Sequence, residues 1–191
     1  MIYIPKLKFG NLRTLEAFLK TLEFDFCSIK IEDLEKIDQG TLLIPGNGNW
    51  SSYIESGIIN LIKTKKYMNF IGICGGFQIF FQNSEEGPGN GSALMSGNVK
   101  KLSSVTPTIG YLDVGEYGPM YFSNSYGVPF KQDKNKNIEL YEYDGKKYIG
   151  CFRFKNLIGF QFHPEVSGNL GREIFLKYTN HLNLFKVQIQ M

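Results

Sequence analysis

One cysteine of this sequence lies in the surroundings of an activated nucleophile. Cys74 is the centre of Gly72-Ile73-Cys74-Gly75-Gly76, with an apolar pair before it and the mostly apolar run 77–81 after it. This order predicts a strand, a sharp turn and a helix. The turn would strain the backbone of the cysteine and require small neighbours, and the helix N-terminus would favour the thiolate. A packing cysteine in a glycine-rich turn is the alternative, and this segment alone does not decide between the two.

A second segment offers a base and a group that could orient it. His163 and Glu165 flank Pro164 at the end of the β-prone run 157–162. Side chains two residues apart on an extended chain point to the same side. Glu165 could therefore accept one ring proton of His163 and leave the other nitrogen free as a base. A capped core histidine and a solvated carboxylate are the alternatives, but together with Cys74 the pair predicts a nucleophilic triad.

A family resemblance spreads over nearly the whole chain. It is carried by Phe9-Gly10-Asn11-Leu12-Arg13, Ile44-Pro45-Gly46-Asn47-Gly48, the turn around Cys74 with Gln78, Ser84-Glu85-Glu86-Gly87-Pro88-Gly89, Tyr121-Phe122-Ser123-Asn124-Ser125-Tyr126 and Phe160-Gln161-Phe162-His163-Pro164-Glu165. With these segments the chain resembles class I glutamine amidotransferases, and among them the glutaminase subunits of imidazole glycerol phosphate synthase. The resemblance implies a three-layer, flavodoxin-like α/β fold whose mixed central sheet is mostly parallel.

The resemblance also implies the roles of individual residues. Cys74 would attack the side-chain amide of L-glutamine, His163 would transfer protons, and Glu165 would orient His163. The backbone N–H groups of Gly75 and Asn47 would form the oxyanion hole. A plain glycine-rich turn is the alternative for the Asn47 segment. The substrate's α-amino and α-carboxylate groups would be held by Gln78, Glu86, Ser125 and Tyr126. Solvent-exposed polar side chains are the alternative for Gln78 and Glu86, and no cofactor is implied.

Ammonia is lost by protonation and diffusion, so a glutaminase of this kind implies a synthase partner. In the resembling subfamily the partner is a (β/α)8-barrel cyclase of histidine biosynthesis, which forms a heterodimer with the glutaminase. Several positions that face the partner there differ here: Val166 replaces a lysine, Asn124 a histidine, Tyr111-Leu112 a Trp-Asn pair, Lys6-Leu7-Lys8 a stretch with Asp-Tyr-Gly, and Gly75 a leucine beside the nucleophile.

Three functional hypotheses follow from these matches and departures. The first is the glutaminase of histidine biosynthesis. The second is a paralogous glutaminase that supplies ammonia to another synthase, such as one that amidinates a nucleotide or a surface sugar. The third is a catalytically silent regulatory subunit, which an intact triad argues against.

Composition limits the class of protein. The chain has 191 residues, of which 42% are hydrophobic and 20% charged, and its net charge is +3. These values favour one globular domain over residues 1–191 and do not favour nucleic-acid binding. With no signal peptide or membrane span expected, the predicted location is cytoplasmic. Three cysteines without paired spacing predict no disulfide, and Cys27 and Cys151 are expected to be buried packing residues. No metal site is expected.

Hydrophobic patterning predicts a change of architecture along the chain. The first half should alternate strands (1–4, 24–29, 41–44, 70–73) with helices (12–22, 54–64, 77–82). The second half should be mainly strands (99–102, 109–114, 120–122, 138–143, 148–154, 157–162), closed by a helix over 170–184. Asp144-Gly145 predicts a tight hairpin, and the glycine-rich loop 83–91 is a candidate wall of the site.

Overall fold

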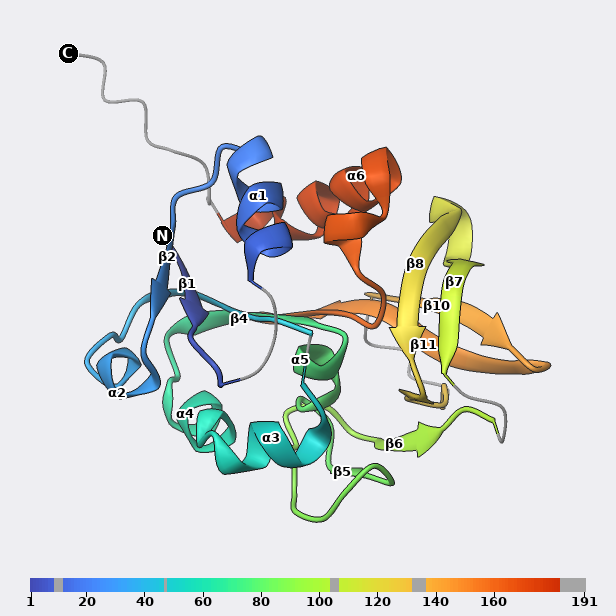
Figure 1. The fold of residues 1–191 in the computed structure, drawn as a ribbon, viewed down its shortest axis with the longest axis horizontal. Coiled ribbons are helices and arrows are strands. Elements are labelled where there is room, and N and C mark those ends of the chain that lie inside the picture. The colour runs from blue at the N-terminus through green and yellow to red at the C-terminus, as the bar shows by residue number, and fades with distance from the viewer. Residues whose placement is uncertain (9–11, 47, 104–106, 132–136, 183–191) are drawn as a thin grey trace.

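The computed structural model describes residues 1–8, 12–46, 48–103, 107–131 and 137–182. Its centre is a seven-stranded sheet in the order β10-β11-β12-β4-β3-β1-β2 (Figure 1). The strands are β1 (Ile2–Pro5), β2 (Phe26–Ile29), β3 (Gly40–Ile44), β4 (Met68–Ile73), β10 (Asn137–Tyr143), β11 (Lys146–Phe154) and β12 (Leu157–Phe160). All neighbours from β12 to β2 are parallel, whereas β10, β11 and β12 pair antiparallel. The predicted mixed, mostly parallel sheet is therefore confirmed.

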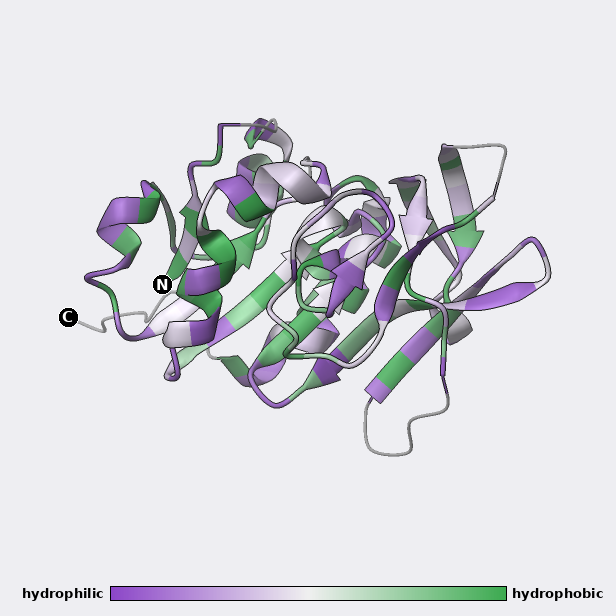
Figure 2. Cartoon of the chain, turned by 90° about the horizontal axis from the view of Figure 1, so that it is seen from below, coloured by the Kyte–Doolittle hydropathy of each residue, from purple (hydrophilic) through white to green (hydrophobic). Residues whose placement is uncertain are grey.

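Helices cover both faces of this sheet, as Figure 1 shows. α1 (Arg13–Thr21) and α6 (Gly168–Thr179) lie on one face, and α3 (Trp50–Glu55), α4 (Ile58–Thr64) and α5 (Gly75–Gln78) on the other. Each face buries its own apolar cluster, so the molecule has three layers and two cores. In Figure 2 the central strands carry mostly hydrophobic residues, which matches strands buried on both sides. The short helix α2 (Ile31–Leu34) follows β2 at the end of the sheet.

Shorter strands stand beside the central sheet and bring further side chains toward it. β5 (Asn83–Ser84), β6 (Asn98–Lys101) and β9 (Tyr126–Gly127) form a small sheet, and β7 (Thr108–Asp113) pairs with β8 (Pro119–Asn124). The 3-10 turns are η1 (Gly115–Tyr117), η2 (Pro164–Val166) and η3 (Asn180–Leu182). The N–H of His163 donates to the carbonyl of Tyr121 at 2.9 Å, which attaches β8 to the segment after β12.

Two predicted helices differ from the structure. The helix expected over 54–64 is two helices, because Gly57 adopts a φ of +78° and begins α4 afresh. The helix expected over 77–82 is the single turn α5. The helix does not continue, because the amides of Ser92 and Met95 in the following loop donate to the carbonyls of Ile79 and Phe80. The predicted Asp144-Gly145 hairpin is present, with both residues at positive φ between β10 and β11.

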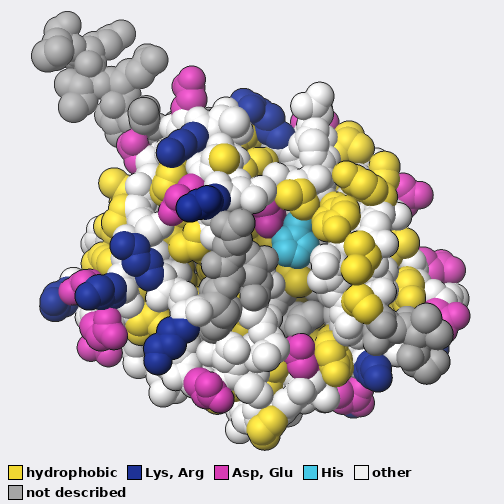
Figure 3. All heavy atoms as spheres, in the orientation of Figure 1, with side chains coloured by type: hydrophobic (Ala, Val, Ile, Leu, Met, Phe, Trp, Pro, Cys, Tyr) yellow, Lys and Arg dark blue, Asp and Glu magenta, His cyan; other side chains and the backbone are white. Residues whose placement is uncertain are grey.

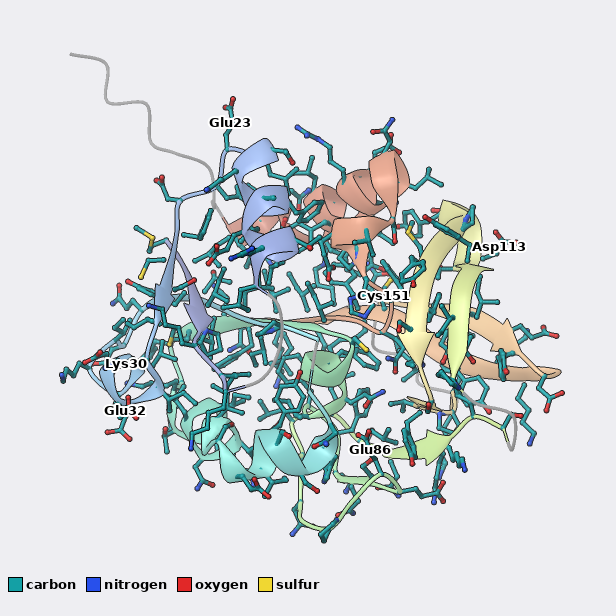
Figure 4. All side chains as sticks on the ribbon, in the orientation of Figure 1. Glu23, Lys30, Glu32, Glu86, Asp113 and Cys151 are labelled. Atoms are coloured by element: carbon teal, nitrogen blue, oxygen red, sulfur yellow. The ribbon has the colours of Figure 1, made fainter. Side chains whose placement is uncertain are left out.

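The prediction for Cys27 is wrong. Its side chain is exposed, because β2 is the outermost strand of the sheet that the described residues form. Cys151 is fully buried on β11, as expected, and burial raises the pKa of its thiol to about 12. Figure 4 shows Cys151 between the central sheet and α6. Among the helices of the described residues, none is both long and apolar enough to cross a membrane.

Candidate active site

The turn between β4 and α5 has the strained geometry that the sequence predicts. Cys74 adopts φ 49° and ψ −109°, a conformation that side-chain-bearing residues rarely adopt. A Cβ added at Gly72 would lie 2.3 Å from the Gly76 carbonyl oxygen, and one at Gly76 would lie 2.3 Å from that of Ile44. Both glycines are therefore required by the close approach of backbone to backbone around Cys74.

His163 and Glu165 form the predicted pair, but not on an extended chain. Nδ1 of His163 lies 2.8 Å from Oε1 of Glu165. The strand ends at Phe160, and Glu165 belongs to the 3-10 turn η2, so the turn rather than a strand brings its carboxylate back to the ring. Ser167 Oγ donates to the His163 carbonyl at 2.6 Å and accepts from the Tyr121 N–H at 2.9 Å, which fixes this turn against β8.

The electrostatics of this pair favour a protonated ring. Burial opposes the charge on His163, but hydrogen bonds to Cys74 and Glu165 outweigh it and raise the pKa of His163 to about 10. The side chains of His163 and Glu165 are 9% and 10% exposed, so water screens their interaction little. Cys74, His163 and Glu165 are thus brought together, as a triad of nucleophile, proton carrier and orienting carboxylate would require.

A cavity of about 320 Å³ opens onto Cys74 and His163. It is lined by Gly46, Gly48, Cys74, Gly75, Gln78, Glu86, Ser123, Asn124 and His163. The space-filling view in Figure 3 shows a histidine side chain near the middle of the face that is turned to the viewer, with hydrophobic side chains gathered beside it. The cavity therefore combines a sulfur, an imidazole, a carboxylate and two amides at the carboxyl ends of parallel strands, where α/β folds bind ligands.

Glu86 lies in this cavity and is held by α3. Its Oε2 accepts the backbone N–H of Trp50 at 2.8 Å. Burial raises the pKa of Glu86, although the hydrogen bond from Trp50 works in the opposite direction. Trp50 Nε1 also donates to the Gly89 carbonyl at 3.3 Å. The loop 83–91 thus contributes Glu86 to the wall of the cavity. Figure 4 shows Glu86 below the central sheet near α5.

The predicted substrate-binding residues divide into two groups. Gln78 and Glu86 line the cavity, whereas Ser125 and Tyr126 are absent from the described lining and Ser123 and Asn124 occupy that wall. Tyr126 contributes its carbonyl, which accepts from Gln78 Nε2 at 2.9 Å and from Asn124 Nδ2 at 2.8 Å. The motif 121–126 pointed to this wall, but β8 ends at Asn124 and Tyr126 belongs to β9.

The predicted oxyanion segment can be followed only in part. Asn47 lies outside the described residues, while its neighbours Gly46 and Gly48 line the cavity. A Cβ at Gly46 would lie 2.7 Å from Cys74 Cβ and 3.0 Å from His163 Cε1. A Cβ at Gly75 would lie 2.7 Å from Tyr53 Cε2, and the Tyr53 hydroxyl donates to the Pro45 carbonyl. The buried ring of Tyr53 thus explains why glycine replaces leucine beside the nucleophile.

The described residues hold no group of three or more His, Cys, Asp and Glu side chains that could bind a metal ion. Within these residues the cavity offers sulfur, imidazole, carboxylate and amide groups instead. A thiol beside an imidazole is a pair that can carry out nucleophilic attack.

Comparison with known proteins agrees with this geometry. The sequence matches the family Glutamine amidotransferase class-I over residues 8–179, so the chain belongs to the class I glutamine amidotransferases. It is similar to the imidazole glycerol phosphate synthase subunit HisH of Staphylococcus epidermidis, with 30% identity over 182 residues, 91% of this chain and 94% of that protein. The subunit HisH of Staphylococcus aureus is 30% identical over 187 residues, with the same coverage.

The fold has solved counterparts as well. A crystal structure described as a glutamine amidotransferase superposes with a TM-score of 0.66 at 17% identity, covering 94% of this chain and 98% of that one. At this identity the likeness shows the fold alone, and it confirms the predicted α/β architecture.

Proposed function

We propose that this protein hydrolyses L-glutamine to glutamate and ammonia and delivers the ammonia to the cyclase subunit of imidazole glycerol phosphate synthase in histidine biosynthesis. The observation that carries the proposal is that one cavity is lined by Cys74 on its strained turn and by His163, whose ring is paired with Glu165. The likeness to HisH subunits over 91% of the chain supports the pathway. A reduced catalytic thiol fits a cytoplasmic location.

The first half-reaction is the transfer of the glutamyl group to sulfur. The Cys74 thiolate attacks the side-chain amide carbon of glutamine and forms a tetrahedral intermediate. The C–N bond then breaks, and protonated His163 donates its proton to the nitrogen, which leaves as ammonia. Glu165 stabilises the charged ring before this step, since its carboxylate lies 2.8 Å from the ring nitrogen. A γ-glutamyl thioester on Cys74 remains.

The second half-reaction consumes water. Neutral His163 removes a proton from water, the hydroxide attacks the thioester carbon, and the C–S bond breaks to release glutamate and restore the thiolate. Each tetrahedral intermediate carries a negative oxygen that needs backbone donors. We assign these to the N–H groups of Gly75 and Asn47, each typically worth about 3 kcal/mol in the barrier.

Substrate recognition in this proposal uses the polar wall of the cavity. The Glu86 carboxylate binds the α-ammonium group, and Gln78 with Asn124 and Ser123 surrounds the rest of the amino acid. Ser125 and Tyr126 contribute through the backbone that shapes this wall, in line with the Gln78–Tyr126 hydrogen bond. A carboxylate with a raised pKa is favoured in its charged form once an ammonium ion binds beside it.

The partner docks in this proposal beside the mouth of the cavity, where apolar side chains are exposed. Ile109, Tyr111 and Val166 are 65%, 61% and 40% exposed. The ring of Tyr111 contacts that of Tyr121 at 5.5 Å between centroids, and Tyr121 lies 6.5 Å from the ring of His163. An apolar band of this kind next to a site is typical of a protein-binding surface. A (β/α)8-barrel subunit covering it would form a heterodimer and receive the ammonia.

A second candidate is a paralogous glutaminase that serves another synthase. The exposed Val166 favours it, because an apolar side chain stands where the resembling subunits carry a lysine. The chemistry at Cys74 would be the same, and only the acceptor of ammonia would differ. A silent regulatory subunit, the third candidate, would need no assembled triad.

The glutaminase proposal is tested by supplying nitrogen in two forms. In a complex with its synthase, Cys74→Ala should abolish turnover with glutamine and retain turnover with ammonium salts, since only the first half-reaction uses the thiolate. Equal loss with both nitrogen sources would contradict the assignment. Labelling of Cys74 by an electrophilic glutamine analogue excludes the silent subunit if it occurs.

The acceptor is tested with purified partners. The free chain should hydrolyse glutamine slowly, and a histidine-pathway cyclase with bound acceptor should accelerate it and bind it in calorimetry. Absence of binding and of acceleration would reject this partner and favour the paralogous glutaminase.

A further inference from the structure

Gln161 lies behind the sulfur of Cys74, in the segment that follows β12. Its side chain is fully buried, and its Nε2 lies 3.9 Å from Cys74 Sγ. Its backbone N–H donates to the Gly150 carbonyl at 2.8 Å, so the residue is fixed at both ends. Burying an amide is unfavourable unless its polar atoms are bonded. A leucine of similar size would fill this position without that requirement, so the choice of an amide calls for a physical reason.

The hydrogen bonds determine which end of the Gln161 amide faces the sulfur. Nε2 of Gln78 lies 2.9 Å from the carbonyl oxygen of Tyr126, and a carbonyl oxygen can only accept. That end of the Gln78 amide is therefore its NH2 group. The same nitrogen lies 3.1 Å from Gln161 Oε1, so the oxygen of Gln161 faces Gln78. The NH2 group of Gln161 must then face Cys74 Sγ.

The groups around the Cys74 sulfur act in opposite directions on the stability of its thiolate form. The Ser123 carbonyl oxygen lies 4.0 Å from Sγ, where it can accept a hydrogen bond from a thiol but repels a thiolate. The Gln161 N–H favours the thiolate, as does the protonated ring of His163. Without the Gln161 donor, the repulsion between the Ser123 carbonyl and the thiolate would be less compensated, and the thiolate would be less stable. The effect would fall on the charged form of sulfur and not on the neutral thiol.

We propose that Gln161 is a positioning residue for the nucleophile: its amide donates to the Cys74 thiolate, and Gln78 and the Tyr126 carbonyl fix that amide in the donating orientation. The inference rests on the proposed function of Cys74 and adds a residue to which the triad assigns no role. It also gives Gln78 a second task, because the same side chain that lines the cavity orients the amide behind the sulfur.

The test measures the pH dependence of alkylation of Cys74 in the full chain. The background is Cys27→Ser, since Cys27 is the exposed cysteine that would also react. With iodoacetamide and mass spectrometry of the Cys74 peptide, Gln161→Leu should move the pH–rate profile upward by about half a pH unit or more. The plateau rate at high pH should stay unchanged, because the ionised sulfur remains accessible. Glutamine hydrolysis should lose kcat with little change in KM.

The matched control is Thr179→Val. It removes another buried side-chain hydrogen bond, from Thr179 Oγ1 to the Phe175 carbonyl at 2.8 Å, far along α6. It should lower stability without moving the alkylation profile. A folded Gln161→Leu protein whose profile superimposes on that of the parent would overturn the proposal and leave Gln161 a packing residue.

A second measurement needs no substitution at Gln161. In the unmutated chain, the NMR signals of the Gln161 side-chain NH2 should titrate together with Cys74 and stop titrating in Cys74→Ser. Signals that do not respond to the ionisation of the sulfur would also overturn the proposal. Neither readout requires hydrolysis of glutamine. Failure of the proposed function would instead be seen as an unmutated Cys74 that alkylates normally but is not labelled by a glutamine analogue.

Discussion

Glu165→Gln tests the electrostatic core of the site. The substitution keeps the size of the side chain and an acceptor oxygen within 2.8 Å of His163 Nδ1, but it removes the negative charge. In the parent, burial opposes a charged His163 ring, and the hydrogen bonds to Cys74 and Glu165 outweigh burial. The variant loses one of the two groups that raise the pKa of His163. Its ring should therefore be charged over a narrower pH range.

The size and sign of the effect follow from burial and from that pKa. A hydrogen bond to a charged group contributes about 1.5–3 kcal/mol, and both side chains here are about nine-tenths buried. The pKa of His163 rises from 6.5 to about 10 on folding. Protonation thus stabilises the folded state fully below pH 6.5, and this contribution is lost as pH rises toward 10. Glu165→Gln should cost about 2 kcal/mol below pH 6.5, and the cost should shrink toward pH 10.

Urea unfolding at the two ends of this pH range measures the effect. Trp50 is the single tryptophan and is buried, so its fluorescence reports unfolding. Glu85→Gln is the control, because Glu85 pairs with Lys100 on the surface at 2.8 Å and an exposed pair contributes under about 1 kcal/mol. A cost for Glu165→Gln that equals the control, or that does not change with pH, would refute this electrostatic reasoning.

Three further predictions concern the surroundings of the nucleophile. Gly75→Ala should lower the free energy of unfolding by about 1–3 kcal/mol and reduce kcat, measured by thermal unfolding and glutaminase assays, because its Cβ would overlap the buried ring of Tyr53. Val166→Asp should weaken binding of the partner in calorimetry by on the order of 1–3 kcal/mol and leave labelling of Cys74 in the free chain intact; unchanged binding would remove Val166 from the interface. Cys27→Ser and Cys151→Ser should both retain most glutaminase activity and change stability only; an essential Cys151 together with a dispensable Cys74 would mean that the triad is misassigned.

The central strands and the cysteine turn could be predicted because their signals are local. Apolar runs bounded by glycine and proline identify strands, and Gly72 reflects a backbone contact within the turn, with the carbonyl of Gly76. The Asp144-Gly145 hairpin is equally local, since both residues take the positive φ that a tight turn needs.

Features that depend on distant contacts could not be read from the sequence. α5 is short because amides from residues 92–95 take the carbonyls that a longer helix would use. Cys27 is exposed because β2 is an outer strand. The hydrophobic pattern of a single segment does not predict its place in the strand order. Glu165 reaches His163 through a 3-10 turn, although the pair itself was predicted.

Some residues of the candidate site could likewise be predicted from local motifs, whereas others could not. Cys74, Gln78, Glu86 and His163 were predicted and line one cavity. Ser123 and Asn124 were missed because the sequence does not show that β8 ends at Asn124 and that Tyr126 belongs to another strand, β9. Gln161 was missed as well, although a lone amide between two buried phenylalanines was a signal for a bonded polar group.

The most direct measurement is the chemical state of Cys74 during turnover. The unmutated chain is mixed with glutamine, quenched rapidly in acid, digested and analysed by mass spectrometry. A γ-glutamyl group should be found on the Cys74 peptide, and it should be absent after Cys74→Ala. Glutamine hydrolysis by a chain that carries no glutamyl group on Cys74, or that carries it on another cysteine, would contradict the proposed nucleophile.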